Sequence, residues 1–161
     1  MKVKATICID APKERVWKVL ADVAAIHLWV ASIESAHCEG EQKRGVGTVR
    51  ICHLKGGNTI KERWTAWEEG HSFTYQAADI ALLKSATNQW SVEDINGKTL
   101  LTSEATVQLK GGVLGRLLEP LVAIWSKRLG AESLASLKYW VETEHPFTGK
   151  RTDLPALSTT C

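Results

Sequence analysis

The most regular apolar pattern in the chain lies near its end, over residues 113–143. Apolar side chains recur there at offsets of three and four, the spacing of one face of an α-helix: Leu114, Leu117, Leu118, Leu121, Val122, Trp125 and Leu129. Pro120 removes one backbone hydrogen bond and predicts a bend. Because so long an apolar face needs a partner, we expect this helix to close over the apolar side of a sheet.

Alternation of apolar and polar residues predicts strands before that helix. Residues 2–9 alternate strictly, and residues 32–39 form a second candidate strand. Between them, Asp10-Ala-Pro12 is typical of a helix start, because proline fits the first turn. This predicts a helix to about Ala21 and a second short helix over residues 23–29.

Three residue pairs, Gly56-Gly57, Glu69-Gly70 and Asn96-Gly97, predict two-residue hairpin turns. Each turn fixes the register of its hairpin, because the residue numbers of all cross-strand pairs in one hairpin add up to the same value. The expected cross-strand pairs are Val49 with Trp64, Ile51 with Glu62, His53 with Ile60, Glu62 with Ala77, Trp64 with Tyr75, Ala66 with Phe73, Val92 with Leu101, Trp90 with Ser103, Asn88 with Ala105 and Ala86 with Val107. Across the longer connection at residues 79–85 we match Tyr75 with Trp90. These registers place the following residues on the outer face of the sheet: Arg50, Lys61, Arg63, Trp67, Thr74, Gln76, Gln89, Glu93, Thr102 and Glu104.

Together these elements predict an α+β fold, with two short helices between strands 1 and 2. A seven-stranded, curved antiparallel sheet would wrap round the long C-terminal helix. The chain length of 161 residues is typical of one domain. We assign that domain to residues 1–144 and expect residues 145–161 to form a loop and a polar tail.

Composition excludes several function classes. The formal net charge of +2 is scattered and does not predict nucleic-acid binding. No apolar run is long enough to span a membrane, and the N-terminus lacks a signal core, so we expect a cytoplasmic protein. Its four cysteines contain no C-x-x-C pair, which favours reduced thiols over a disulfide framework or a zinc site. The scattered histidines predict no metal, and we expect a monomer or homodimer.

Several segments resemble a known superfamily: residues 11–22 (APKERVWKVLAD), Trp29, residues 45–50 (GVGTVR), residues 60–64 (IKERW) and residues 73–75 (FTY). They are similar to the SRPBCC superfamily of START-related and birch-pollen-allergen-like proteins, particularly its polyketide cyclase/dehydratase-like branch. The resemblance spans roughly residues 3–143. It implies a helix-grip fold with a ligand held between the concave face of the sheet and the last helix. We expect no cofactor.

Applied to this chain, that arrangement predicts a pocket with aromatic, apolar and a few polar walls. The expected ligand-binding residues are Trp29, Ile51, Glu62, Trp64, Tyr75, Asn88, Trp90, Ser103, Leu118, Leu121, Val122 and Trp125. Seven tryptophans against two phenylalanines and two tyrosines are unusual. They either line such a cavity or fill it.

Three functions fit this pattern. The preferred one is binding of a small hydrophobic ligand that is aromatic, polyketide-like or lipid-like. The second is a polyketide cyclase/dehydratase-like enzyme, with Glu62 as acid/base and Asn88 or Tyr75 orienting a carbonyl, because burial on an apolar face raises the pKa of a carboxyl. Glu62 could equally be a structural carboxylate held by Asn88, His53 or an arginine. The third is a protein-interaction domain with a filled core.

Overall fold

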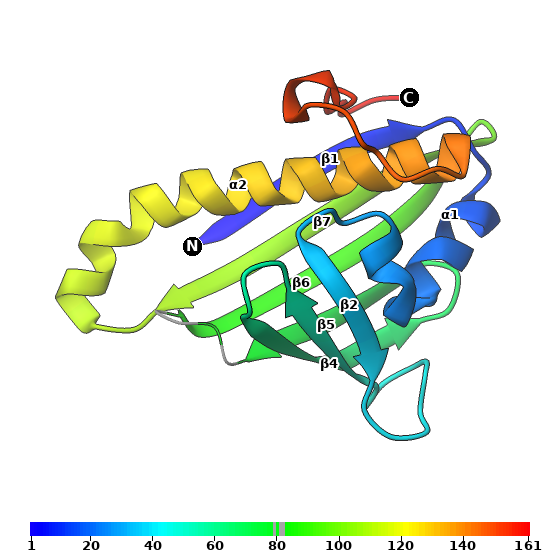
Figure 1. Ribbon diagram of the computed structural model, residues 1–161. Coiled ribbons are helices and arrows are strands. Elements are labelled where there is room, and N and C mark those ends of the chain that lie inside the picture. The colour runs from blue at the N-terminus through cyan, green and yellow to red at the C-terminus, as the bar shows by residue number, and fades with distance from the viewer. Residues whose placement is uncertain (79, 81–82) are drawn as a thin grey trace.

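The computed structural model describes residues 1–78, 80 and 83–161, apart from the side chains of residues 113–116. Within these residues, seven strands form one antiparallel sheet in the order β1-β7-β6-β5-β4-β3-β2 (Figure 1). The strands are β1 (Lys2–Ile9), β2 (Ile33–Cys38), β3 (Val49–Leu54), β4 (Thr59–Glu68), β5 (Ser72–Ala78), β6 (Leu83–Ile95) and β7 (Lys98–Leu109). The helices are α1 (Lys13–Ala21), the 3₁₀ helix η1 (Val23–Leu28), α2 (Gly112–Thr143) and the 3₁₀ turn η2 (Arg151–Asp153). The predicted helix-grip fold is confirmed.

The N-terminal elements follow the sequence pattern closely. Alternate residues of β1, Ile7 and Ile9, are fully buried, as the period of two predicts. Helix α1 buries Val16, Trp17 and Leu20 at helical spacing against the end of the sheet. Together they form one end of the core.

The β6–β7 hairpin has all four predicted pairs, but the β3–β4 hairpin is shifted by one residue. The Leu54 amide donates to the Asn58 carbonyl, so the loop between them holds three residues instead of two. Arg50 therefore pairs with Glu62, and Ile51 pairs with Lys61. A shift of one residue exchanges the two faces of a strand, so Arg50 joins the inner face and Ile51 leaves it.

The β4–β5 hairpin also has a three-residue loop, closed by the pair Glu68–Ser72. An irregularity at Thr65 adds one residue to β4 and compensates for the longer loop. Trp64 therefore keeps its predicted partner Tyr75, whereas Trp67 turns to face Phe73. Our placement of Trp67 on the outer face was wrong.

The register between β5 and β6 differs from the predicted one by two residues. Tyr75 pairs with Asn88, and Phe73 pairs with Trp90. A shift of two residues keeps every side chain on its predicted face. The prediction relied on the connecting residues 79–85, of which 79, 81 and 82 lie outside the described part of the chain.

Helix α2 lies along β1 and contacts β1 and β7 (Figure 1). In its second half, Leu134, Leu137 and Val141 are buried against the sheet. At 3.6 residues per turn, this buried stripe continues towards the N-terminus through Gly130 and Ala123, which are half-buried. A Cβ added at Gly130 would meet no atom within 4 Å, so nothing packs closely against this side of α2 at that position.

The larger apolar residues of that first half lie off this stripe. Leu118, Leu121 and Trp125 are 45%, 66% and 56% exposed, and Val122 is half-buried. Leu114, which we also assigned to the stripe, has a side chain outside the described set. The predicted apolar wall made by Leu118, Leu121 and Trp125 is thus largely solvent-facing, because the apolar phase changes between the two halves.

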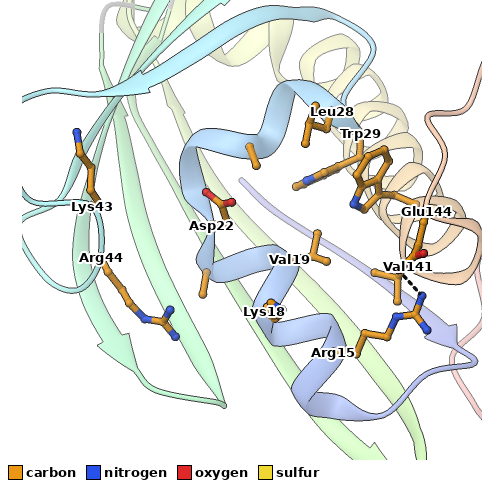
Figure 2. Close-up of a pocket in the computed structure, with 13 residues that line it drawn as sticks. Arg15, Lys18, Val19, Asp22, Leu28, Trp29, Lys43, Arg44, Val141 and Glu144 are labelled. Carbon is orange, nitrogen blue, oxygen red and sulfur yellow. Dashed lines mark hydrogen bonds and ion pairs between the residues drawn. The ribbon is translucent and has the colours of Figure 1, made fainter.

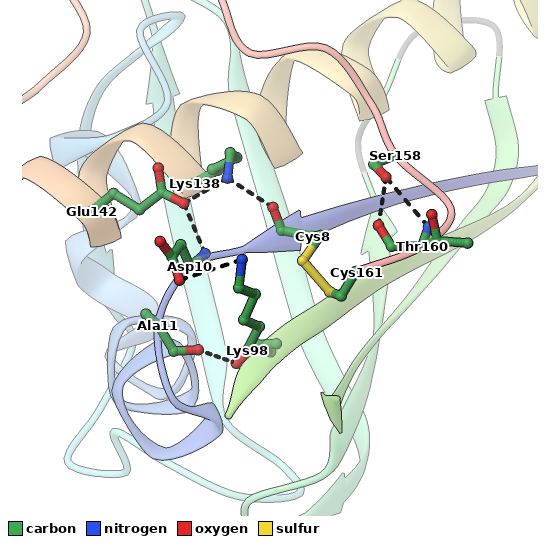
Figure 3. The surroundings of a disulfide bond; sticks show 10 residues. Cys8, Asp10, Ala11, Lys98, Lys138, Glu142, Ser158, Thr160 and Cys161 are labelled. Atoms are coloured by element: carbon green, nitrogen blue, oxygen red, sulfur yellow. Dashed lines mark hydrogen bonds and ion pairs between the residues drawn. A yellow bond between two sulfur atoms is a disulfide. The ribbon is translucent and has the colours of Figure 1, made fainter. Parts of the chain in front are cut away.

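The C-terminal segment after α2 folds back over the helix and reaches β1 (Figure 3). Arg151 forms an ion pair with Glu132 of α2. The segment ends in a disulfide between Cys8 and Cys161, whose Cα atoms lie 5.2 Å apart. Our prediction of four reduced thiols was wrong for this pair, since spacing along the chain does not reveal which cysteines meet in space. Cys38 and Cys52 are free and buried.

Glu69, in the loop after β4, joins three segments. Its carboxylate accepts hydrogen bonds from Trp17 Nε1 at 2.6 Å and Trp67 Nε1 at 2.9 Å, and from Arg44 Nε at 3.0 Å. The hydrogen bonds of Arg44, Trp67 and Trp17 lower the pKa of Glu69 to about 2. The ionised carboxylate therefore holds α1, β4 and the β2–β3 loop together.

Because the folded-state pKa of Glu69 lies below its ordinary value of 4.5, its stabilising effect is complete above that value and is lost as the pH falls towards 2. We expect Glu69→Gln to lower the urea midpoint at pH 7, with the difference from the wild type shrinking to nothing near pH 2. Glu68→Gln, on an exposed neighbour, is the matched control. A pH-independent difference would contradict the assigned role.

Candidate functional site

The concave face of the sheet carries a cluster of aromatic side chains. Trp64 lies 5.1 Å from Tyr75 and 5.8 Å from Phe73, measured between ring centroids. Trp90, opposite Phe73, contacts Trp29 of the segment after η1 with a centroid separation of 6.1 Å. The structure thus brings Trp29, Trp64, Tyr75 and Trp90 together, as predicted.

A buried ion pair lies beside this cluster. Arg50 and Glu62 are 3% and 8% exposed. Arg50 Nε donates to Glu62 Oε2 at 2.7 Å, and Nη2 lies 2.6 Å from the same oxygen. Arg50 Nη1 also donates to the Val23 carbonyl at 2.6 Å. Our prediction that Arg50 is a surface residue was wrong, and its inward position follows from the one-residue register shift.

The ion pair with Arg50 determines the electrostatic environment of the Glu62 carboxylate. The Arg50 guanidinium lies 4.9 Å from the Trp64 ring, so it also makes a cation–π contact. Cys52 Sγ donates to the same carboxylate oxygen at 3.4 Å, and burial raises the pKa of this thiol to about 12. Glu62 therefore contacts a cation and a neutral thiol. This arrangement matches the alternative in which an arginine holds a structural carboxylate.

A second set of polar side chains is hydrogen-bonded across β5, β6 and β7. Ser103 Oγ donates to Asn88 Oδ1 at 3.0 Å, and Asn88 Nδ2 donates to the Tyr75 hydroxyl oxygen at 3.1 Å. Burial, with a smaller contribution from the Glu62 charge, raises the pKa of Tyr75, so it stays a neutral phenol at physiological pH. Among the described residues, the Tyr75 hydroxyl hydrogen has no acceptor. Tyr75 and Asn88 are half-buried as whole residues.

Three tryptophan N–H groups in the cluster also lack acceptors. Within the described part of the chain, Nε1 of Trp29, Trp64 and Trp90 is buried without a hydrogen-bond partner. An unpaired buried donor is destabilising. The concave face thus combines apolar rings with several unused hydrogen-bond donors.

Other predicted site residues lie elsewhere. Ile51 lies on the opposite face of the sheet from Glu62, because the register of the β3–β4 hairpin is shifted by one residue. Leu118, Leu121 and Trp125 are exposed on α2. Ser103, in contrast to these residues, is buried on the concave face, as expected.

A cleft that the sequence did not indicate lies outside the sheet, between α1, η1, the β2–β3 loop and the end of α2 (Figure 2). Its volume is about 890 Å³. Its apolar wall includes Val19, Leu28 and Trp29, and charged side chains surround it. These residues come from four separate segments, and no spacing along the chain links them.

Two classes of site were not found. Over residues 1–78, 80 and 83–161, no group of three or more His, Cys, Asp or Glu side chains is arranged to hold a metal ion. No helix in the same residues is long and apolar enough to cross a membrane.

The fold and the concave face define a helix-grip protein, and comparison with known proteins assigns its family. Residues 1–142 match the family described as "Polyketide cyclase / dehydrase and lipid transport". The chain belongs to this family, within the polyketide cyclase-like branch of the SRPBCC superfamily. No curated protein matches the chain.

Solved structures share the fold at low sequence identity. TTHA0849 from Thermus thermophilus is 19% identical, with a TM-score of 0.73 over 89% of this chain and 99% of that one. Zhui aromatase/cyclase from Streptomyces sp. R1128 is 17% identical, with a TM-score of 0.71 over 88% of this chain and 93% of that one. Ara h 8.0201 is 17% identical, with a TM-score of 0.66 over 89% and 98%. These similarities establish the fold alone.

Proposed function

We propose that this protein binds a small, mainly apolar ligand carrying a carbonyl oxygen, on the concave face of the sheet beside α2. The observation that carries the proposal is the Tyr75 hydroxyl, held by Asn88 at the border of an aromatic cluster. Among the described residues its hydrogen has no acceptor. A ligand carbonyl would accept this hydrogen while its rings contact the neighbouring aromatic side chains.

Family membership supports the same class of ligand, since the family description names polyketides and lipids. The concave face supplies the apolar area for such molecules through Trp64, Phe73 and Trp90. The unused indole N–H groups of Trp64 and Trp90 favour a ligand with oxygen acceptors over a pure hydrocarbon.

The enzyme hypothesis with Glu62 as acid/base has less support. A general acid or base must exchange a proton with the substrate, whereas one oxygen of Glu62 already accepts from Arg50 and Cys52. Asn88 holds the Tyr75 hydroxyl and remains suited to orienting a carbonyl through it. We therefore place Glu62 in a supporting position and Tyr75 in contact with the ligand.

The Tyr75 hydroxyl is expected to recognise the carbonyl oxygen specifically. Tyr75→Phe should weaken binding of acetylnaphthalene by about 3- to 10-fold, because one hydrogen bond contributes about 0.5–1.5 kcal/mol. Ethylnaphthalene has a similar size and no carbonyl, so its affinity should stay unchanged. Equilibrium dialysis of both compounds with both proteins measures the four affinities.

Tyr139→Phe, which removes a hydroxyl on α2, is the matched control and should bind both compounds as the wild type does. Equal losses for the ketone and the hydrocarbon in Tyr75→Phe would mean that the ring packs differently, and the proposed hydrogen bond would be refuted.

A further inference from the structure

We infer that the outer cleft is a second binding site, for an amphipathic carboxylate whose apolar chain lies on its wall and whose head group meets Lys18 and Trp29. The cleft lies outside the sheet, although the Trp29 ring also contacts Trp90 of the concave face, and the inference does not depend on the proposed function. Its evidence is the shape, the charge balance and an unused donor.

The cleft has the size and surface of a small-molecule site. Its volume of about 890 Å³ lies in the range of known ligand pockets, about 300–1,000 Å³. The apolar lining residues come from three helices. Val19 lies in α1, Ala25 and Leu28 lie in η1 with Trp29 directly after it, and Trp140 lies in α2. Figure 2 shows α1 and η1 between the β2–β3 loop, with Lys43 and Arg44, and the end of α2, with Val141 and Glu144. An apolar chain would lie along the wall formed by Val19, Leu28 and Trp29.

The charges around the cleft favour an anion. The lining residues include four cations, Arg15, Lys18, Lys43 and Arg44, and two anions, Asp22 and Glu144. Arg44 pairs with Glu69, and Arg15 lies 3.5 Å from Glu144. Among the described residues, Lys18 and Lys43 have no carboxylate within ion-pair distance. The cleft therefore offers two ammonium groups without an ion-pair partner against one remaining carboxylate, Asp22. Of the two, Lys43 donates to the Gly40 carbonyl at 3.0 Å, so Lys18 is the better placed to bind an anion.

Trp29 supplies an independent indication of a ligand. It lines the cleft, is only 7% exposed, and its Nε1 is buried with no hydrogen-bond partner in the described chain. A buried donor without an acceptor is costly unless a ligand or water supplies one. A carboxylate oxygen in the cleft would accept this N–H while Lys18 neutralises its charge.

Decanoate, decanol and decyltrimethylammonium share one alkyl chain and differ in head-group charge, so they test the inference directly. We expect decanoate to bind at least tenfold more tightly than either of the others in calorimetric titrations below micelle-forming concentrations. In ¹⁵N–¹H spectra, decanoate should shift the Trp29 indole signal, which is assigned by its absence in Trp29→Phe. The six other tryptophan signals report that this variant is folded.

Variants locate the site. Trp29→Phe replaces the indole with a smaller aromatic ring and removes the donor, and it should weaken decanoate binding about tenfold. Lys18→Gln should weaken it several-fold and reduce its dependence on salt. Lys55→Gln, an exposed lysine in the β3–β4 loop, is the matched control and should bind normally.

The inference is overturned if saturating decanoate leaves the Trp29 indole signal in place. It is also overturned if Lys18→Gln and Lys55→Gln bind decanoate equally, since the carboxylate would then lie elsewhere. Tyr75→Phe separates the two sites, because it should leave decanoate affinity unchanged whatever its effect on acetylnaphthalene.

Discussion

Replacing Arg50 with methionine is expected to destabilise the protein by about 3–5 kcal/mol, the typical cost of leaving one member of a buried ion pair unpaired. Glu62 would remain on the inner face beside Trp64 without its cation. The measurement is the free energy of unfolding in urea at pH 7.

A second substitution separates the effect of charge from that of packing. Adding Glu62→Leu should restore most of the loss, because the double variant holds no buried charge. If the single and double variants are equally unstable at pH 7, the loss reflects packing, and the importance of the ion pair is contradicted.

Breaking the Cys8–Cys161 disulfide is expected to have the second large effect. The bond joins residues 153 positions apart. In the chain-entropy account, closing so long a loop stabilises the folded state by up to about 5 kcal/mol, which corresponds to a shift in Tm of roughly 10–20 °C. Differential scanning calorimetry of the oxidised protein, with and without a reductant, measures the shift.

Cys8→Ser is the matched variant, and its Tm should equal that of the reduced wild type and be insensitive to reductant. Alkylation after unfolding should label two thiols in the oxidised protein, Cys38 and Cys52. Four labelled thiols in protein taken from its host would show that the bond is absent there, as in a reducing cytoplasm. Equal Tm values for the oxidised and reduced proteins would contradict a stabilising role.

Local patterns predicted most of the fold. Asn96-Gly97 fixed the β6–β7 register correctly, because a two-residue turn leaves one choice of pairing. Gly56-Gly57 and Glu69-Gly70 predicted the wrong loop length. Each pair belongs to a three-residue loop, and the apolar pattern does not distinguish such a loop from a two-residue turn. Only the irregularity at Thr65 preserved the pairing of Trp64 with Tyr75.

The candidate site was harder to predict because it depends on those registers. A register error of one residue placed Arg50 on the outer face, so the arginine that holds Glu62 could not be identified from the sequence. Tyr75 was placed near Trp90, although its cross-strand neighbour is Asn88. The outer cleft was not predicted, because its lining residues, such as Lys18 and Lys43, lie far apart in the sequence. Only the packing of α1 beside the β2–β3 loop brings them to the same cleft.

The proposed role of the concave face is tested most directly by locating a bound ketone. Nuclear Overhauser effects between acetylnaphthalene and the protein report which protons lie within a few ångströms of the ligand. We expect effects to the side chains of Tyr75, Asn88 and Trp90. Effects confined to Val19, Leu28 and other residues of the outer cleft would contradict a ligand site on the concave face.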